Sequence, residues 1–331
     1  MDEIQHTETQ IGLVVIGRNE GDRLRKCLMS VLGQVGKVVY VDSGSTDGSV
    51  YMARSLGVEV LELDMTRPFT AARARNEGFK HLLALVPELL YVQFVDGDCE
   101  VIAGWLNKAA LFLNERLDVA VVCGRRRERF PDRSVYNLLC DIEWDTPVGE
   151  AKACGGDAMM RADALEQVGG FRDNLIAGEE PELCVRLRAR GWKIWRMAEE
   201  MTLHDAAISH IGQWWRRTKR CGYAYAEGAH LHGAPPEMHG VKASWSVWIW
   251  GVGIPAAAIC MSIYLGVWGL SILFIYPAQV VRLALNGKRS VRENWWSALF
   301  LVLGKFPEAF GQLSFLTDRL AGRSARLIEY K

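Results

Sequence analysis

Asp96 and Asp98 are spaced two residues apart and close an apolar run over residues 89–95. The run predicts a buried strand, so both carboxylates are expected where that strand ends. Carboxylate oxygens are the ligands that hard divalent cations prefer, and Gly97 between them lets another group approach closely. The spacing therefore predicts a site for one divalent cation. A solvated Asp-Gly turn is the alternative that the residues leave open.

The elements that must position these carboxylates alternate along the N-terminal part of the chain. The strand-like apolar runs are residues 11–16, 37–41, 58–63, 89–95 and 119–123, and the helix-like segments between them are residues 24–32, 49–56, 71–86 and 105–114. This βαβα order predicts a parallel sheet with helices on both faces. Ligands bind at the carboxyl ends of the strands in such sheets, so we expect the polar clusters that follow these runs to share one site.

Composition and charge narrow the class of protein. The 331 residues carry no net formal charge, so the chain has no general attraction for nucleic acid, and no nucleic-acid partner is expected. The eight cysteines form no Cys-x-x-Cys pair, which predicts reduced thiols in a cytosolic setting and neither a zinc site nor a disulfide framework. The polar segment Met1–Gln10 is not typical of a signal peptide. The basic segment Arg125–Arg129 predicts a solvated loop, or one that contacts lipid phosphate.

A long apolar stretch follows in the C-terminal part, where residues 243–281 contain no charged side chain. As a helix this stretch would measure about 58 Å, close to twice the roughly 30 Å of a bilayer core. It therefore predicts two short membrane crossings that form a hairpin, with the turn near Tyr264-Leu265-Gly266. Several tryptophans in the stretch favour a membrane interface. A pair of apolar core helices in a soluble protein is the alternative.

Beyond the apolar stretch, Arg282, Lys288, Arg289 and Arg292 form a basic patch. Apolar residues then recur every three or four positions over residues 295–316, which predicts a helix that lies in the membrane interface and bends at Pro307. Docking on the soluble domain and a short third crossing are the alternatives. The composition thus predicts an α/β domain over residues 1–240, a transmembrane helical hairpin over 241–285 and an amphipathic tail over 286–331.

From about Ile11 to Gly222, the chain resembles the family 2 glycosyltransferases, which have the nucleotide-sugar-binding GT-A fold. Five segments carry the resemblance in the family's order: residues 14–20, 41–49, 74–78, 96–98 and 179–183, the last followed by Arg186 and Gly191-Trp192. The resemblance implies an α/β fold with a Rossmann-like mixed sheet, to which the C-terminal α-helical membrane region is added.

The resemblance also implies residues that bind the donor, a UDP- or GDP-sugar. These are Gly17, Arg18, Asn19, Glu20, Asp42, Ser43, Arg75, Asp96 and Gly97. Asp42 would accept a hydrogen bond from the nucleotide base, and capping of the following helix is its alternative.

Two further segments resemble parts of the family's binding site. The loop Gly155-Gly156-Asp157 is similar to the loop that contacts the acceptor and the donor sugar, with a plain turn as the alternative. Gln213 and Arg216 resemble an element of processive synthases, but the tryptophan after the arginine is missing here. We therefore expect Arg216 or Arg217 to contact phosphate or membrane, and an amphipathic helix resting on the bilayer is the alternative.

By the same resemblance, Asp98 and Asp96 would hold Mg²⁺ or Mn²⁺ against the leaving diphosphate. His204, which follows the Gly-Trp segment, would join this metal site, and a histidine hydrogen-bonded in a loop is the alternative. Glu180 stands where the family usually has aspartate and would be the general base, with Glu179 as the competing residue. A base opposite the leaving group implies inversion.

The sequence therefore predicts a metal-dependent inverting glycosyltransferase of the inner or plasma membrane, with its catalytic domain in the cytoplasm. Its acceptor would be a hydroxyl of a glycan or lipid-linked molecule in cell-envelope or exopolysaccharide synthesis. Transfer to polyprenyl phosphate and a non-catalytic membrane adaptor with a nucleotide-sugar fold are the alternatives. Whether the chain forms a homo-oligomer is left open.

Overall fold

The computed structural model describes residues 10–323, so most of Met1–Gln10 and the end of the predicted tail lie outside the described residues. This part of the chain divides into two compact units. The first unit comprises residues up to 129, 143–175 and 179–206, and the second comprises 130–142, 176–178 and the residues from 207 onward. Each unit is described by itself.

Nine strands of the first unit, counted within residues 10–323, form one sheet in the order β3-β2-β1-β4-β8-β6-β9-β5, with β7 beside β9. Their bounds are β1 Ile11–Gly17, β2 Lys37–Asp42, β3 Glu59–Glu62, β4 Tyr91–Asp96, β5 Cys99–Val101, β6 Val119–Glu128, β7 Gly149–Ala151, β8 Ala158–Arg161 and β9 Lys193–His204. Strands β3, β2, β1 and β4 are parallel, as predicted. Strand β8 then runs antiparallel between β4 and β6, so the sheet is mixed, and β4 and β6 are not neighbours.

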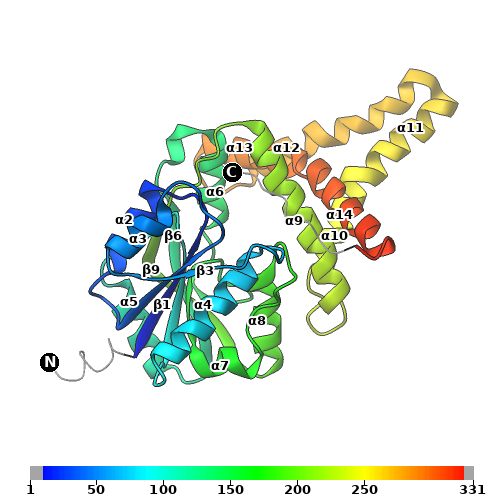
Figure 1. Ribbon diagram of the computed structural model, residues 1–331. Coiled ribbons are helices and arrows are strands. Elements are labelled where there is room, and N and C mark those ends of the chain that lie inside the picture. The colour runs from blue at the N-terminus through cyan, green and yellow to red at the C-terminus, as the bar shows by residue number, and fades with distance from the viewer. Residues whose placement is uncertain (1–9, 324–331) are drawn as a thin grey trace. The chain divides into compact units, whose positions relative to one another are not determined.

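The helices of the first unit are α2 Asp22–Val31, α3 Ser49–Ser55, α4 Ala71–Leu85, α5 Trp105–Glu115, α7 Ala162–Gln167 and α8 Glu179–Ala189. Helices α2 and α3 lie on one face of the sheet and α4 on the other (Figure 1). Helix α4 packs closely because residue 78 is glycine: a Cβ there would lie 2.5 Å from a methyl group of Val14 and 2.8 Å from one of Val41. Arg75 lies one helical turn before Gly78 on α4, so this close packing holds Arg75 near the ends of the strands.

The predicted basic loop at Arg125–Arg129 is wrong, because β6 continues to Glu128 and pairs with β9. Carboxylates compensate the arginines along this strand. The Arg125 guanidinium lies 3.6 Å from Asp145, and that of Arg127 lies 2.7 Å from Glu200. Paired in this way, the basic side chains are accommodated in a sheet rather than in a solvated loop.

The second unit is helical in the part that the structure describes. Its elements are η1 Pro131–Arg133, α6 Val135–Glu143, α9 Ile211–His232, α10 Val241–Val247, η2 Trp248–Gly253, α11 Ile254–Leu265, η3 Gly266–Phe274, α12 Ile275–Leu285, α13 Val291–Leu303 and α14 Lys305–Leu320. The predicted hairpin turn is confirmed, since α11 ends at Leu265 and Gly266 has a φ of 59°. The two arms meet closely, because a Cβ on Gly269 would lie 2.2 Å from the backbone nitrogen of Ser262. Figure 1 shows this hairpin in yellow and orange.

Two helical stretches, Val241–Leu285 and Val291–Leu320, are long and apolar enough to cross a membrane by length and composition. The second stretch breaks at Gly304 and not at the predicted Pro307. Pro307 lies in the first turn of α14, where its missing N–H leaves no hydrogen bond unmade. Helix α14 packs on α9, and a Cβ on Gly311 would lie 2.0 Å from the carbonyl oxygen of Lys219. Whether this tail crosses the membrane or lies on it stays a prediction.

Candidate active site

The parallel strands bring their polar ends to one edge of the sheet. Gly17 pairs with Asp42 across β1 and β2, and Ile16 pairs with Asp96 across β1 and β4. The segments after these strands, which carry most of the residues predicted to bind the donor, therefore start side by side. The nitrogen of Gly97 donates a 2.8 Å hydrogen bond to the carbonyl of Ile16, which continues the contact past the strand end.

Arg75 links two of the predicted motifs. Its Nη2 lies 2.8 Å from Asp96 Oδ1, and its Nη1 lies 2.8 Å from Glu179 Oε1. The guanidinium is buried, and burial by itself would lower the pKa of Arg75, but the two carboxylates outweigh this effect and raise it. Arg75 thus stays charged and joins the Asp-x-Asp motif to the acidic cluster at the start of α8.

Arg126 is a second cation at this edge, and the sequence pattern did not predict its place there. Its Nη2 lies 3.2 Å from Asp96 Oδ2, and its Nε lies 3.4 Å from Asp157 Oδ2. Asp157 is buried, accepts a 3.0 Å hydrogen bond from the Asp96 nitrogen and a 2.8 Å bond from the Thr202 hydroxyl, and so ties the predicted 155–157 loop to β4. Gly156 is needed beside them, because a Cβ there would lie 2.9 Å from Asp96 Oδ2.

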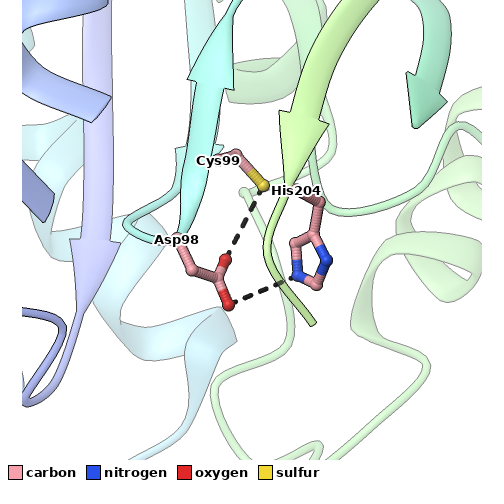
Figure 2. Close-up of side chains that lie close together, drawn as sticks. All are labelled: Asp98, Cys99 and His204. Atoms are coloured by element: carbon pink, nitrogen blue, oxygen red, sulfur yellow. Dashed lines mark hydrogen bonds and ion pairs between the residues drawn. The ribbon is translucent and has the colours of Figure 1, made fainter. Parts of the chain in front are cut away.

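Asp98 and His204 face each other across the pairing of β5 with β9 (Figure 2). Asp98 Oδ2 lies 3.3 Å from His204 Nε2, and both side chains are buried. Burial, assisted by the charge of Arg126, lowers the pKa of His204, which favours the neutral imidazole that binds metals. The other ring nitrogen, Nδ1, lies 3.5 Å from Glu128 Oε2, an arrangement that orients metal-bound histidines.

These residues fit a divalent cation. A carboxylate oxygen and a neutral imidazole nitrogen lie close together, and a second carboxylate stands behind the ring. Cys99 Sγ lies 3.6 Å from Asp98 Oδ1, but burial raises the pKa of this thiol well above its usual range, and a thiol is a poor ligand for a hard cation. Asp96, predicted as a further ligand, has its carboxylate engaged by Arg75 and Arg126.

The predicted base-binding residues shape the loops at this edge. Asp42 is buried, and its Oδ2 accepts hydrogen bonds from the nitrogens of Gly44 and Ser45 at 2.9 Å and 2.8 Å. Asn19, at a φ of 56°, accepts a 2.7 Å bond from the Thr46 nitrogen and so holds the loop after β1 against the loop after β2. Glu20 in the same loop pairs with Arg23 at 2.7 Å. Asp42 does not cap the following helix, because the N-cap of α3 is Gly48. The Asp47 carboxylate accepts a hydrogen bond from the nitrogen of Ser49 at the start of α3.

The two acids that compete for the role of base have different surroundings. Glu179 is ion-paired with Arg75, whereas Glu180 is buried and surrounded by neutral donors. Glu180 Oε1 accepts hydrogen bonds from the Cys154 nitrogen at 2.5 Å and from the thiols of Cys154 and Cys184 at 3.0 Å and 3.1 Å. Burial raises the pKa of Glu180 although these donors oppose the shift. An ion-paired acid beside a buried acid with neutral donors suits a division of roles between Glu179 and Glu180.

Among the predicted site residues, all of which lie within residues 10–323, only Arg216 belongs to the second unit. Its side chain is exposed on α9. The other predicted site residues belong to the first unit. The contact of Arg216 with phosphate or membrane stays a prediction.

Known proteins match both the sequence and the fold. Residues 13–169 match the model of Glycosyl transferase family 2. Glycosyltransferase AglE of Haloferax volcanii is 23% identical over 211 residues, which are 59% of this chain and 67% of that protein. The succinoglycan biosynthesis protein ExoA of Rhizobium meliloti is 24% identical over 229 residues, or 65% of this chain and 69% of ExoA.

Among solved structures, mannosyltransferase PcManGT from Pyrobaculum calidifontis, in complex with GDP-Man and Mn²⁺, superimposes with a TM-score of 0.62 at 19% identity. The match covers 92% of this chain and 87% of that one. The mixed sheet is therefore a glycosyltransferase fold of the GT-A type. The residues that match the family model extend from β1 to α7.

Proposed function

We propose that the protein is a metal-dependent, inverting glycosyltransferase that moves a sugar from a UDP- or GDP-sugar to a hydroxyl group of a glycan or lipid-linked acceptor. The observation that carries the proposal is the bridge by Arg75 between Asp96 and Glu179. This bridge holds the strand end that would bind the donor beside the helix end that would supply the base. A transferase needs these two groups of residues in one place.

The donor end is built from two kinds of residue. Asp98 and His204 would hold Mg²⁺ or Mn²⁺, and such an ion supplies Lewis-acid stabilisation to a departing diphosphate. The support for Mn²⁺ is that PcManGT was solved with GDP-Man and Mn²⁺. Arg75 and Arg126 add fixed positive charge at the same strand end, and their pairing with Asp96 keeps them oriented before the donor arrives. Asn19 and Asp42 hold the loops that would enclose the nucleotide base.

At the acceptor end, Glu180 would receive the proton of the acceptor hydroxyl. The hydroxyl oxygen forms its bond to the anomeric carbon while the bond from that carbon to the diphosphate oxygen breaks, which inverts the configuration. A carboxylate with a raised pKa is a better proton acceptor than an ordinary one. Glu179 fits the role less well, because its charge already pairs with Arg75.

We further propose that the protein works at the inner or plasma membrane with its catalytic domain in the cytoplasm. Lys242, Arg282, Lys288 and Arg289 flank the apolar hairpin, and positive flanks favour the cytoplasmic side. The similarity to ExoA, a succinoglycan biosynthesis protein, supports an acceptor from envelope or exopolysaccharide synthesis. We also propose that the chain comprises an α/β catalytic domain over residues 1–240, a transmembrane hairpin over 241–285 and an amphipathic tail over 286–331.

A donor screen tests the proposal. The full chain in detergent is incubated with each common UDP- and GDP-sugar plus Mn²⁺ or Mg²⁺, and release of UDP or GDP is measured. We expect one donor to be turned over only with metal, and Asp98→Ala to abolish that turnover while the exposed Asp22→Ala does not. Turnover that is equally fast with chelator would remove the metal from the proposal. The absence of turnover with every donor and with added membrane lipid extract would refute the proposed activity.

A further inference from the structure

Glu180 stands in a cluster that its proposed role as base does not explain. Its Oε1 lies 3.0 Å from Cys154 Sγ and 3.1 Å from Cys184 Sγ, and the two sulfurs lie 3.9 Å apart. Glu180 and Cys184 are buried, whereas Cys154 is partly exposed in the loop before Gly155. One carboxylate oxygen and two sulfurs thus lie close enough together to bind one metal ion.

The separation of the two sulfurs matches that in a tetrahedral zinc centre. With Zn–S bonds of about 2.3 Å, two sulfurs on a tetrahedral ion stand about 3.8 Å apart, close to the observed separation of Cys154 and Cys184. A sulfur and a carboxylate oxygen on the same ion stand about 3.5 Å apart, so Glu180 has to retreat by a few tenths of an ångström. Three protein ligands would leave the fourth position of a tetrahedral ion for a water molecule.

The donor set also separates this cluster from the proposed Asp98–His204 site. Two sulfurs select thiophilic ions such as Zn²⁺, whereas a carboxylate and an imidazole accept Mn²⁺. The sequence predicted no zinc site because Cys154 and Cys184 lie far apart along the chain. The fold brings them together, because α8 carries Cys184 one turn after Glu180 and the loop with Cys154 folds over that turn.

We propose that Cys154, Glu180 and Cys184 bind a thiophilic divalent cation, and that its binding inhibits glycosyl transfer by occupying the carboxylate of Glu180. The ion displaces one proton from each thiol to solvent and bonds to both sulfurs and to Oε1. The inhibitory part rests on the proposed function of Glu180, whereas the binding part does not. The alternative is that the thiols only donate hydrogen bonds to Glu180.

Cobalt is the probe for binding, because thiolate-bound Co²⁺ gives sulfur-to-metal charge-transfer absorption that oxygen and nitrogen ligands do not. The full chain, reduced and in detergent, is titrated with Co²⁺ and then with Zn²⁺. We expect a charge-transfer band that Zn²⁺ removes, and loss of this band in Cys154→Ser and in Cys184→Ser. Cys260→Ser, which removes an exposed thiol of the hairpin, is the matched control and should keep the band. Circular dichroism checks that each variant is folded.

Inhibition is then measured with saturating Mn²⁺ and rising free Zn²⁺, each variant being compared with its own zinc-free rate. We expect Cys154→Ser to need at least about 10-fold more Zn²⁺ for half-inhibition than the parent and Cys260→Ser proteins. A band that survives in folded Cys154→Ser and Cys184→Ser proteins would overturn the site. A site that binds Co²⁺ while Zn²⁺ leaves transfer unchanged would overturn the inhibition. If no donor is turned over, the absorption experiment still decides on the site, and only the proposed function fails.

Discussion

Arg126 Nη2 lies 3.2 Å from Asp96 Oδ2, which makes an arginine from β6 a partner of the Asp-x-Asp motif at the end of β4. The neighbouring Arg127 leaves the same strand on the other side and pairs with Glu200. Because successive residues of a strand point to opposite faces, two adjacent arginines have unrelated surroundings. This pair therefore gives a test of the site with a matched control.

We expect Arg126→Ala to lower kcat/KM for transfer by about 10²-fold, in the range found when one preorganised donor to a developing negative charge is removed. Arg127→Ala should change it little, since that side chain is half exposed and paired at the surface. Steady-state kinetics with the donor found in the screen measures both. Equal effects of the two variants would show that Arg126 acts only through the local fold.

His204→Ala should weaken Mn²⁺ binding by more than 10-fold, and Glu128→Gln should weaken it by roughly 10-fold or more because its carboxylate orients the imidazole. The exposed His210→Ala is the control, and it should bind Mn²⁺ as the parent protein does. Electron paramagnetic resonance of free Mn²⁺ reports the affinity without any substrate. Unchanged binding in His204→Ala would remove this histidine from the metal site.

Glu180→Gln should retain donor binding but lose transfer by about 10²- to 10⁴-fold, since it removes a proton acceptor and little else. Glu179→Gln instead breaks the ion pair to Arg75, so we expect weaker donor binding and a smaller loss of kcat. Isothermal titration with the donor and single-turnover transfer separate the two effects. If Glu179→Gln keeps donor binding and loses transfer, the base is Glu179.

The pH dependence of transfer follows from the burial of Glu180. Burial raises the pKa of this carboxyl above the ordinary glutamate value of 4.5, and only the ionised form accepts a proton. As pH falls, activity should therefore be lost earlier than an ordinary glutamate would allow, with the acidic limb of kcat/KM centred above pH 4.5. The residual activity of Glu180→Gln should lack this limb. The same limb in both proteins would assign it to another group.

The sequence predicted those parts of the fold that local patterns determine. Helix α4 is an example, because its apolar residues recur with helical spacing and so define its buried face. Thr70 defines its start, since the Thr70 hydroxyl accepts a hydrogen bond from the Arg73 nitrogen. Strand β8 was not predicted, because its short apolar run gives no sign that it inserts antiparallel between β4 and β6.

The site likewise contains residues that local motifs predicted and residues that only the fold brings together. Asp98 and Glu180 belong to motifs with recognisable spacing, so the sequence indicated them directly. Arg126 and Cys154 acquire their roles only through partners distant in the sequence, Asp96 for the first and Glu180 for the second. No local pattern encodes such pairs. The one available signal was that Arg126 and Glu128 stand two apart, which in a strand places both on one face.

The hairpin allows a last prediction, on membrane topology. The arm from Val241 to Leu265 measures about 37 Å at about 1.5 Å per residue, enough to cross a roughly 30 Å bilayer core. If both arms cross, the tip at Tyr264 emerges on the side opposite to Asn286 at the end of the second arm. Both tip and end are exposed, so each accepts a cysteine as a label site.

In a Cys260→Ser background, we expect Tyr264→Cys to react with a membrane-impermeant maleimide added outside intact cells, and Asn286→Cys to react only after lysis. Labelling of Asn286→Cys in intact cells would invert the proposed orientation. A tip that reacts only after lysis, while a permeant maleimide labels both positions, would mean that the hairpin enters the bilayer without crossing it. The basic flanks favour the first result, because moving Arg282 and Lys288 across the membrane opposes the positive-inside bias.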